Sequence, residues 1–159
     1  PHYTANGFDE AEFVISTNPG EPERSLGQVA SGGELSRIML AMKSCLANQD
    51  DTPTLVFDEI DVGISGRTAQ KVAEKMSILS RHHQVICITH LSQIAAMADA
   101  HYLIEKNVEK EKTITSIRLL SKEEEIEELA RMIGGAKITE TTIHTVTEMK
   151  GLAEQAKIN

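Results

Sequence analysis

The run Thr-Leu-Val-Phe-Asp-Glu-Ile-Asp at residues 54–61 constrains the fold more than any other part of the sequence. Its first four residues are apolar or β-branched and follow Pro53, a pattern that predicts a short strand buried on both faces. Asp58, Glu59 and Asp61 then come at the carboxyl end of this strand. Because ligands bind at the carboxyl ends of strands in open α/β sheets, the three carboxylates mark a candidate site.

Carboxylates near a sheet are costly unless a metal ion, an arginine or a lysine offsets their charge. A hydrophobic strand followed by Asp-Glu is the Walker B pattern of phosphate-handling enzymes, in which the Asp serves magnesium and the Glu polarises a water molecule. The alternative is a core strand that ends in solvated acids.

Hydrophobic periodicity places helices and strands along the rest of the chain. The predicted strands cover residues 11–16, 84–89, 101–106 and 113–120, and the predicted helices cover 31–46, 69–79, 92–98, 121–134 and 139–157. The order strand, helix, strand, helix within residues 54–98 implies parallel strands with right-handed crossovers. We therefore expect one α/β domain over residues 1–159, with a mainly parallel sheet flanked by helices and a small hairpin.

Ser31-Gly32-Gly33-Glu34 opens the first long predicted helix. Apolar residues then recur at helical spacing at Leu35, Ile38, Met39, Met42 and Leu46. Ser31 and Glu34 stand three residues apart and form a candidate capping box. Two glycines let the backbone approach a ligand closely, and the positive end of the helix dipole suits an anion. The alternative is an ordinary helix start whose glycines shape the entry loop.

His90 ends the strand predicted after the acidic run. Because neighbouring parallel strands bring their carboxyl ends together, we expect His90 to lie near Asp58 and Glu59. A hydrogen-bonded structural histidine is the alternative. Asp61 begins a stretch, residues 61–65, that could reach a partner subunit or a water molecule, or that could simply form a turn.

The sequence contains no Gly-x-x-x-x-Gly-Lys-Ser/Thr motif. Gly27 and Gly32 have the glycine spacing, but Gly33 and Glu34 stand where the lysine and the hydroxyl residue are required. Nothing in this chain is therefore expected to cradle the β- and γ-phosphates of a nucleotide. The chain holds half of the parts that ATP hydrolysis needs.

Composition excludes several function classes. The net charge of −8 argues against nucleic-acid binding over the whole surface, and 3% aromatic residues with no Trp argue against a base-stacking platform. No run approaches the length of a membrane helix, and no zinc motif occurs. Cys45 and Cys87 lie in apolar stretches, and we expect both to be reduced core residues of a cytosolic protein.

Other polar residues favour plain structural roles. We expect His82 and His83 to form a solvated helix end, residues 123–128 an exposed acidic helix face, and residues 106–112 a charged hairpin tip.

Three stretches together resemble the C-terminal part of the RecN family. These bacterial double-strand-break repair proteins are related to the SMC proteins. The stretches are Gly-Gly-Glu-Leu-Ser-Arg at 32–37, Phe-Asp-Glu-Ile-Asp-Val-Gly-Ile-Ser-Gly-Arg-Thr-Ala at 57–69, and Ile-Thr-His-Leu-Ser-Gln-Ile-Ala-Ala-Met-Ala-Asp at 88–99. Residues 16–22 and 131–135 fit as well, so the resemblance covers almost the whole chain.

The resemblance implies the C-terminal lobe of a P-loop ATPase head of the ABC type. Such a head is split by a long coiled coil, and its N-terminal lobe carries Walker A; a chain that starts at Pro1 fits a piece of such a protein. Two heads sandwich two ATP molecules, so the implied partners are the N-terminal lobe, a second head in a homodimer, and DNA bound by the full-length protein. The implied location is the bacterial cytoplasm, at the nucleoid, with no membrane.

The resemblance also assigns roles to residues. Asp58 would serve Mg²⁺, Glu59 would be the catalytic base, and His90 would be the switch that contacts the γ-phosphate. The signature loop, Ser31 to Glu34, would contact the ATP of the opposite site, and Asp61 would belong to the loop that crosses the head dimer.

The sequence departs from the family pattern at Glu34, where ABC signatures usually have Gln, and at Ser92, where Pro is expected. Two alternatives stay open: a non-catalytic module that mediates head interaction, and the head lobe of another SMC-like or RecF-like protein.

Overall fold

The computed structural model describes residues 5, 7–9, 11–16, 19–29, 31–47, 49, 51–109, 112–135 and 137–158. Its strands are β1 (Val14–Ile15), β2 (Arg24–Ser25), β3 (Thr54–Phe57), β4 (Gln84–Cys87), β5 (Tyr102–Glu109) and β6 (Lys112–Leu119). Its helices are α1 (Leu26–Val29), α2 (Gly32–Leu46), α3 (Gly66–Leu79), α4 (Ser92–Ala96), α5 (Lys122–Gly134) and α6 (Glu140–Ile158). The predicted α/β class and nearly every predicted element are confirmed; the predicted strand at 11–16 is reduced to β1.

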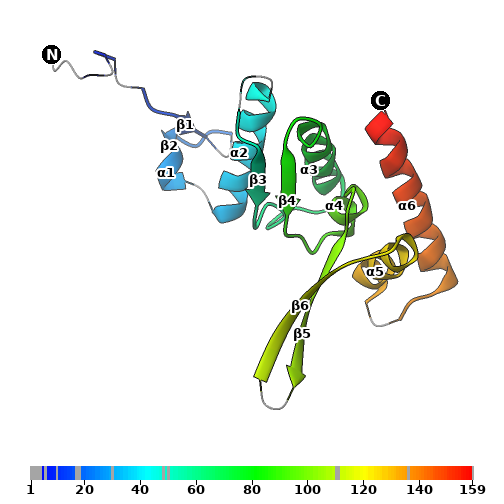
Figure 1. Cartoon of the computed structure of the whole chain (residues 1–159). Helices are drawn as coiled ribbons and strands as arrows, with labels where there is room; N and C mark the ends of the chain where they lie inside the picture. Colours follow the sequence, from blue (N-terminus) through cyan, green and yellow to red (C-terminus); the bar gives the residue numbers. More distant parts are fainter. Residues whose placement is uncertain are drawn as a thin grey trace.

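The parallel pair of β3 and β4 is the centre of the fold (Figure 1). The two strands pair in register from Thr54 opposite Gln84 to Phe57 opposite Cys87, and α3 connects them. Within the described residues neither strand pairs with any other strand. Both strands therefore end at the same edge, as the sequence predicts.

Only one face of this pair is covered. Leu55 and Phe57 are buried in the main core, whereas Thr54 and Val56 on the opposite face are exposed. The prediction that this strand is buried on both faces is wrong for this chain. Since parallel sheets normally have both faces covered, the bare face is an unusual feature of this structure.

Helices α2 and α3 show opposite outcomes. All five residues of the apolar stripe predicted for α3 are buried: Ala69, Val72, Ala73, Met76 and Leu79. In α2 the buried residues are Gly33 and Leu40, and the predicted stripe instead leaves Leu35, Met39 and Leu46 exposed. The two predicted capping boxes are both formed, one at Ser31 and Glu34 and the other at Ser121 and Glu124.

A second cluster joins α4, α5 and α6. Its fully buried side chains are Leu129 and Val146, and Ala95, Ala96 and Ala130 pack with them. Small residues on α4 and α5 let these helices approach α6 closely, and α6 also contacts α3. This cluster fixes the position of α4, and therefore of the segment that carries His90.

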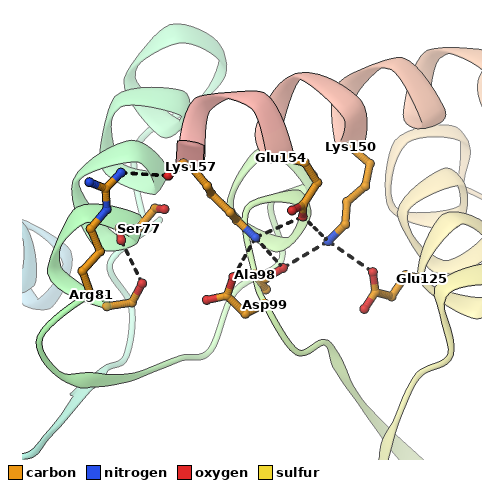
Figure 2. A network of polar contacts seen from close by, with 9 residues as sticks. Ser77, Arg81, Ala98, Asp99, Glu125, Lys150, Glu154 and Lys157 are labelled. Atoms are coloured by element: carbon orange, nitrogen blue, oxygen red, sulfur yellow. Dashed lines mark hydrogen bonds and ion pairs between the residues drawn. The ribbon is translucent and has the colours of Figure 1, made fainter. Parts of the chain in front are cut away.

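Two lysines of α6 bind the segment that follows α4 (Figure 2). Lys150 Nζ and Lys157 Nζ donate to the carbonyl oxygen of Ala98 at 3.1 and 3.3 Å. Lys150 Nζ also lies 3.2 Å from Glu125 Oε2, and Lys157 Nζ lies 2.8 Å from Asp99 Oδ1. Glu125 is therefore buried and paired, and the prediction of a wholly exposed acidic face at 123–128 is wrong at this position.

The antiparallel hairpin of β5 and β6 extends away from the rest of the molecule (Figure 1). Every residue of β6 is exposed, including Ile114, Ile117 and Leu119. The predicted charged tip falls partly on residues 110 and 111, which lie outside the described residues. No helix within the described ranges has the length and apolarity needed to cross a membrane.

Two further expectations are corrected. Cys45 is exposed rather than buried, because it lies on the outward side of α2 near its end. His83 is buried, and its Nδ1 lies 2.7 Å from the carbonyl oxygen of Thr52, whereas His82 is exposed as expected. A polar contact to the loop before β3 thus replaces the solvation expected at this helix end.

We expect Lys150→Met to lower the free energy of unfolding by about 1–3 kcal/mol, because it leaves the buried Glu125 carboxylate without its cation, whereas the Ala98 carbonyl keeps its contact with Lys157. Lys71→Met, on the exposed side of α3, is the matched control and should change stability by less than about 0.5 kcal/mol. Urea denaturation followed by circular dichroism measures both. Equal effects of the two substitutions would show that the contacts of Lys150 contribute little to stability.

Candidate functional site

The acids after β3 lie in a strained turn. Glu59 has φ of 57° and is the only non-glycine residue with positive φ in the described part of the chain. The carbonyl oxygen of Glu59 accepts from the backbone N–H of Val62 at 3.1 Å, and Asp58 Oδ1 accepts from the Glu59 N–H at 2.9 Å. Left-handed backbone at a non-glycine residue costs free energy and is found preferentially at functional sites. Both carboxylates are exposed and can meet a ligand.

Helix α2 holds this turn from one side. Ser36 Oγ donates to the carbonyl oxygen of Asp58 at 2.9 Å. Arg37 Nη1 donates to the carbonyl oxygens of Ile60 and Val62 at 3.1 and 2.9 Å. These contacts fix the backbone of the acidic turn without using its carboxylates, which therefore stay available.

The two glycines of α2 allow this close approach. A Cβ on Gly33 would lie 2.8 Å from the carbonyl oxygen of Glu59 and 3.0 Å from that of Val62. A Cβ on Gly32 would collide with the carboxylate of Glu59. Gly32 and Gly33 thus lie beside Glu59 of the same chain. Ser31 is exposed at the start of α2, where its hydroxyl and backbone N–H both contact Glu34 Oε2.

The segment after β4 closes the other side of the site. Asp61 Oδ2 accepts from Thr89 Oγ1 at 2.6 Å and from the His90 N–H at 2.9 Å, and it lies 3.0 Å from His90 Nδ1. His90 contacts Asp61 of the acidic run, and not Asp58 or Glu59, which were the expected neighbours. Asp61 is 3% exposed, so its contacts lie inside its own chain and not on an outer surface.

The electrostatics of the site follow from this packing. Burial acts to raise the pKa of Asp61, but hydrogen bonds from Thr89 and His90 outweigh it and lower the pKa below its ordinary value. Burial raises the pKa of the Cys87 thiol to about 12, and the negative charges of Asp61 and Asp58 add to the effect. The lowered pKa keeps the buried carboxyl group of Asp61 ionised at neutral pH.

The exposed carboxylates of Asp58 and Glu59 limit what the site can hold. Among the described residues, no three His, Cys, Asp or Glu side chains are placed to hold a metal ion together. Mg²⁺ is commonly held by one or two carboxylates plus substrate phosphates, so Asp58 alone fits a metal that arrives with a nucleotide. One hollow in the described surface is lined by Ile138, Thr139, Glu140, Ile143, His144 and Thr147. A second is lined by Met39, Met42, Lys43, Leu46 and Gln49, and neither of these two contains the acids.

Sequence reasoning missed Ser36, Arg37 and Thr89 as parts of the site. The only available signal was their position, on the first turns of the glycine-led helix and directly before His90. Side-chain contacts to backbone carbonyls leave no pattern in the sequence, because many residue types can make them.

Comparisons with known proteins agree with the resemblance seen in the sequence. The chain is 49% identical over 154 residues to the DNA repair protein RecN of Bacillus subtilis, an alignment covering 97% of this chain and 27% of that protein. It is 48% identical over 157 residues to RecN of Halalkalibacterium halodurans, covering 99% of this chain and 28% of that protein. It is 51% identical over 143 residues to RecN of Treponema pallidum, covering 90% of this chain and 25% of that protein.

The chain thus spans about a quarter of the length of these curated relatives. No protein-family model matches it. A solved structure described as "Structural biochemistry of ATP-driven dimerization and DNA stimulated activation of SMC ATPases" aligns with a TM-score of 0.49 and 22% identity, covering 78% of this chain and 81% of that one.

We expect Gly33→Ala to destabilise the fold by about 1–3 kcal/mol, because the new methyl group meets the carbonyls of Glu59 and Val62. The Val62 N–H holds the first carbonyl in place, and Arg37 holds the second. Gly151→Ala is the matched control. A Cβ there would meet nothing within 4 Å, so the change should stabilise α6 by about 0.5–1 kcal/mol. Thermal unfolding distinguishes the two, and a neutral Gly33→Ala would contradict the close packing of α2 on the acidic turn.

We expect Cys87 to resist alkylation and Cys45 to react. A thiol with a pKa of about 12 holds on the order of one thiolate in ten thousand at pH 8, and Cys87 is also partly buried. Iodoacetamide labelling of the native chain, followed by peptide mass spectrometry, measures both rates in one sample. Labelling after denaturation is the control for Cys87, and equal native rates would contradict the acidic, enclosed surroundings described for that thiol.

Proposed function

We propose that this RecN-like chain is the C-terminal lobe of a split ABC-type ATPase head, which hydrolyses ATP when two heads engage, in DNA double-strand-break repair and recombination. The chain's similarity to RecN over nearly its whole length supports the repair role. The single observation that carries the chemistry is the strained turn after β3, which presents Asp58 and Glu59 while Asp61 ties His90 to the same edge.

Each side chain then has a role in phosphoryl transfer to water. Asp58 holds Mg²⁺, and the bound ion offsets charge on the phosphates. Glu59 accepts a hydrogen bond from the attacking water and orients it, and His90 contacts the γ-phosphate. Glu59 is suited to this role because its carboxylate is exposed while side chains of α2 hold the carbonyls of its neighbours Asp58 and Ile60.

The signature loop serves a second subunit in this proposal. Ser31, Gly32 and Gly33 contact the γ-phosphate bound by the partner head, once the Glu59 side chain, which lies beside Gly32, has turned toward the nucleotide of its own head. Glu34 keeps Ser31 in place through the capping box. The positive end of the α2 dipole favours an anion at this position. Asp61 contributes from inside the chain, through His90.

The phosphate-cradling lysine comes from an N-terminal lobe with Walker A. The bare face of β3 and β4 supports this assembly, because Val56, Ile86 and Ile88 are about half exposed or more. Parallel strands are rarely left open on one face, so a further part of a longer protein is the natural cover. DNA is bound by that longer protein, since this chain carries a net charge of −8, and its place is the bacterial nucleoid.

A second candidate function is a non-catalytic interaction module. The same bare face and the exposed apolar side chains of α2 favour it, since both suit binding to another lobe without any chemistry. A head lobe of another SMC-like or RecF-like protein would share this behaviour.

A chimera tests the proposal, with this chain replacing the matched segment of Bacillus subtilis RecN. We expect the isolated chain to show no ATPase activity, because it has no phosphate-cradling loop, and the chimera to hydrolyse ATP. Glu59→Gln in the chimera should lower turnover by about 10²–10⁴-fold while nucleotide-dependent dimerisation persists, since the amide keeps the shape but cannot polarise the water.

Glu127→Gln, at an exposed position of α5, is the matched control and should leave turnover unchanged. A chimera that dimerises with ATP but never hydrolyses it would favour the interaction module. Robust turnover by the isolated chain, lost with Glu59→Gln, would overturn the split-site proposal.

A further inference from the structure

The buried carboxylate of Asp61 has a role that the acidic turn alone does not explain. Two hydrogen bonds meet on its Oδ2 atom, from the Thr89 hydroxyl at 2.6 Å and from the His90 N–H at 2.9 Å. His90 Nδ1 lies 3.0 Å from the same oxygen, within ion-pair distance. Asp61 is 3% exposed, whereas the His90 side chain is 73% exposed. An interior carboxylate therefore holds a ring whose other side faces solvent.

The charge of Asp61 decides which ring nitrogen carries the proton. Its hydrogen bonds favour the ionised carboxylate, and an ionised carboxylate can only accept hydrogen bonds. The His90 nitrogen that touches it is Nδ1. An unprotonated Nδ1 would place its lone pair against the negative charge of Asp61, so Nδ1 carries the hydrogen and in the neutral ring Nε2 is left with a lone pair.

We propose that Asp61 is a positioning residue that fixes His90 in its Nδ1–H form and turns Nε2 outward as the nitrogen that meets the ligand. The proposal deepens the function given above and rests on it for the identity of that ligand. Asp61 itself touches neither the nucleotide nor the partner subunit; it acts through the imidazole.

The consequence for phosphate binding is chemical. A neutral ring held in this form presents a lone pair at Nε2 and cannot donate to a phosphate oxygen. Once Nε2 takes a proton from solvent, the ring donates from both nitrogens, to Asp61 and to the phosphate, and the carboxylate 3.0 Å away offsets the new positive charge. His90 thus contacts a phosphate as a cation and a water as an acceptor.

The same contact links the two halves of the site. Asp61 is two residues from Glu59, and the turn between them is held by Arg37 through the carbonyls of Ile60 and Val62. A displacement of Asp61 would therefore move His90 and the turn that carries Glu59 together. Thr89 steadies the carboxylate from the β4 side, and its Oγ1 also accepts from the Leu91 N–H at 3.0 Å.

Nitrogen-15 NMR of the ring nitrogens tests the proposal without nucleotide. In the unsubstituted chain, at a pH where the ring is neutral, we expect the His90 Nδ1 signal to have the shift of a protonated nitrogen and Nε2 that of an unprotonated one. Free imidazole side chains favour the opposite form. A His90 signal with Nε2 protonated would overturn the proposal, and this measurement needs no variant to fold.

Two substitutions separate positioning from general packing. Asp61→Ala should shift His90 to the Nε2–H form, whereas Thr89→Val, which removes a different donor from the same carboxylate, should leave the Nδ1–H form in place. Circular dichroism checks that both variants fold. Unchanged His90 signals in a folded Asp61→Ala variant would show that the carboxylate does not set the tautomer.

Turnover in the chimera distinguishes this proposal from the proposed function. We expect Asp61→Asn and His90→Gln to lower ATP turnover by similar factors. The double variant should lower turnover little further, because each single change already abolishes the action of Asp61 through His90. An inactive chimera in which His90 still has the Nδ1–H form would contradict the proposed ATPase function and support the positioning role of Asp61. Fully additive effects would sink the positioning role and keep the function.

Discussion

The hydrogen bonds that converge on Asp61 Oδ2 connect the two segments on which the site depends. One segment leaves β3 and carries Asp58 and Glu59; the other leaves β4 and carries Thr89 and His90. Backbone pairing of the two strands stops at Phe57 opposite Cys87, and the N–H of Ile88 adds one more bond to the carbonyl of Phe57. Beyond that point the hydrogen bonds of the Asp61 carboxylate to Thr89 and His90 hold the two segments together in place of backbone pairing.

A buried carboxylate is stable in this position only because its donors are already in place. Burial alone disfavours its charge, and the donors from Thr89 and His90 reverse that preference. The arrangement resembles the second layer of a metal or catalytic site, in which an acid fixes the form and direction of a histidine. On the other side, α2 holds the turn with one arginine and one serine on main-chain carbonyls. The carboxylates of Asp58 and Glu59 take no part in either set of side-chain contacts, and both stay exposed.

The sequence was most informative where local chemistry decides the structure. Both capping boxes, the end of α5 at Gly135 and the buried stripe of α3 follow from residues within one or two turns of each other. Errors arose where burial depends on what covers an element. Val56 and the apolar residues of α2 look like core residues in the sequence, and they would be core residues if another layer lay over them. The predictions that His83 and Glu125 are exposed are wrong because segments distant in the sequence bring Thr52 and Lys150 into contact with them.

The same reasoning explains why the site was only half predictable. The strand-end rule places Asp58, Glu59, Asp61 and His90 at one edge, and the structure does so. The rule gives no information on which acid turns inward, because that depends on the pleat and on the strained backbone at Glu59. With Glu59 in the left-handed region the chain reverses direction, Ile60 enters the core with no exposed surface, and Asp61 follows it inside. The strain at Glu59 and the burial of Asp61 are therefore linked. The left-handed backbone of Glu59, the residue proposed to orient the water, is what places the Asp61 carboxylate behind His90.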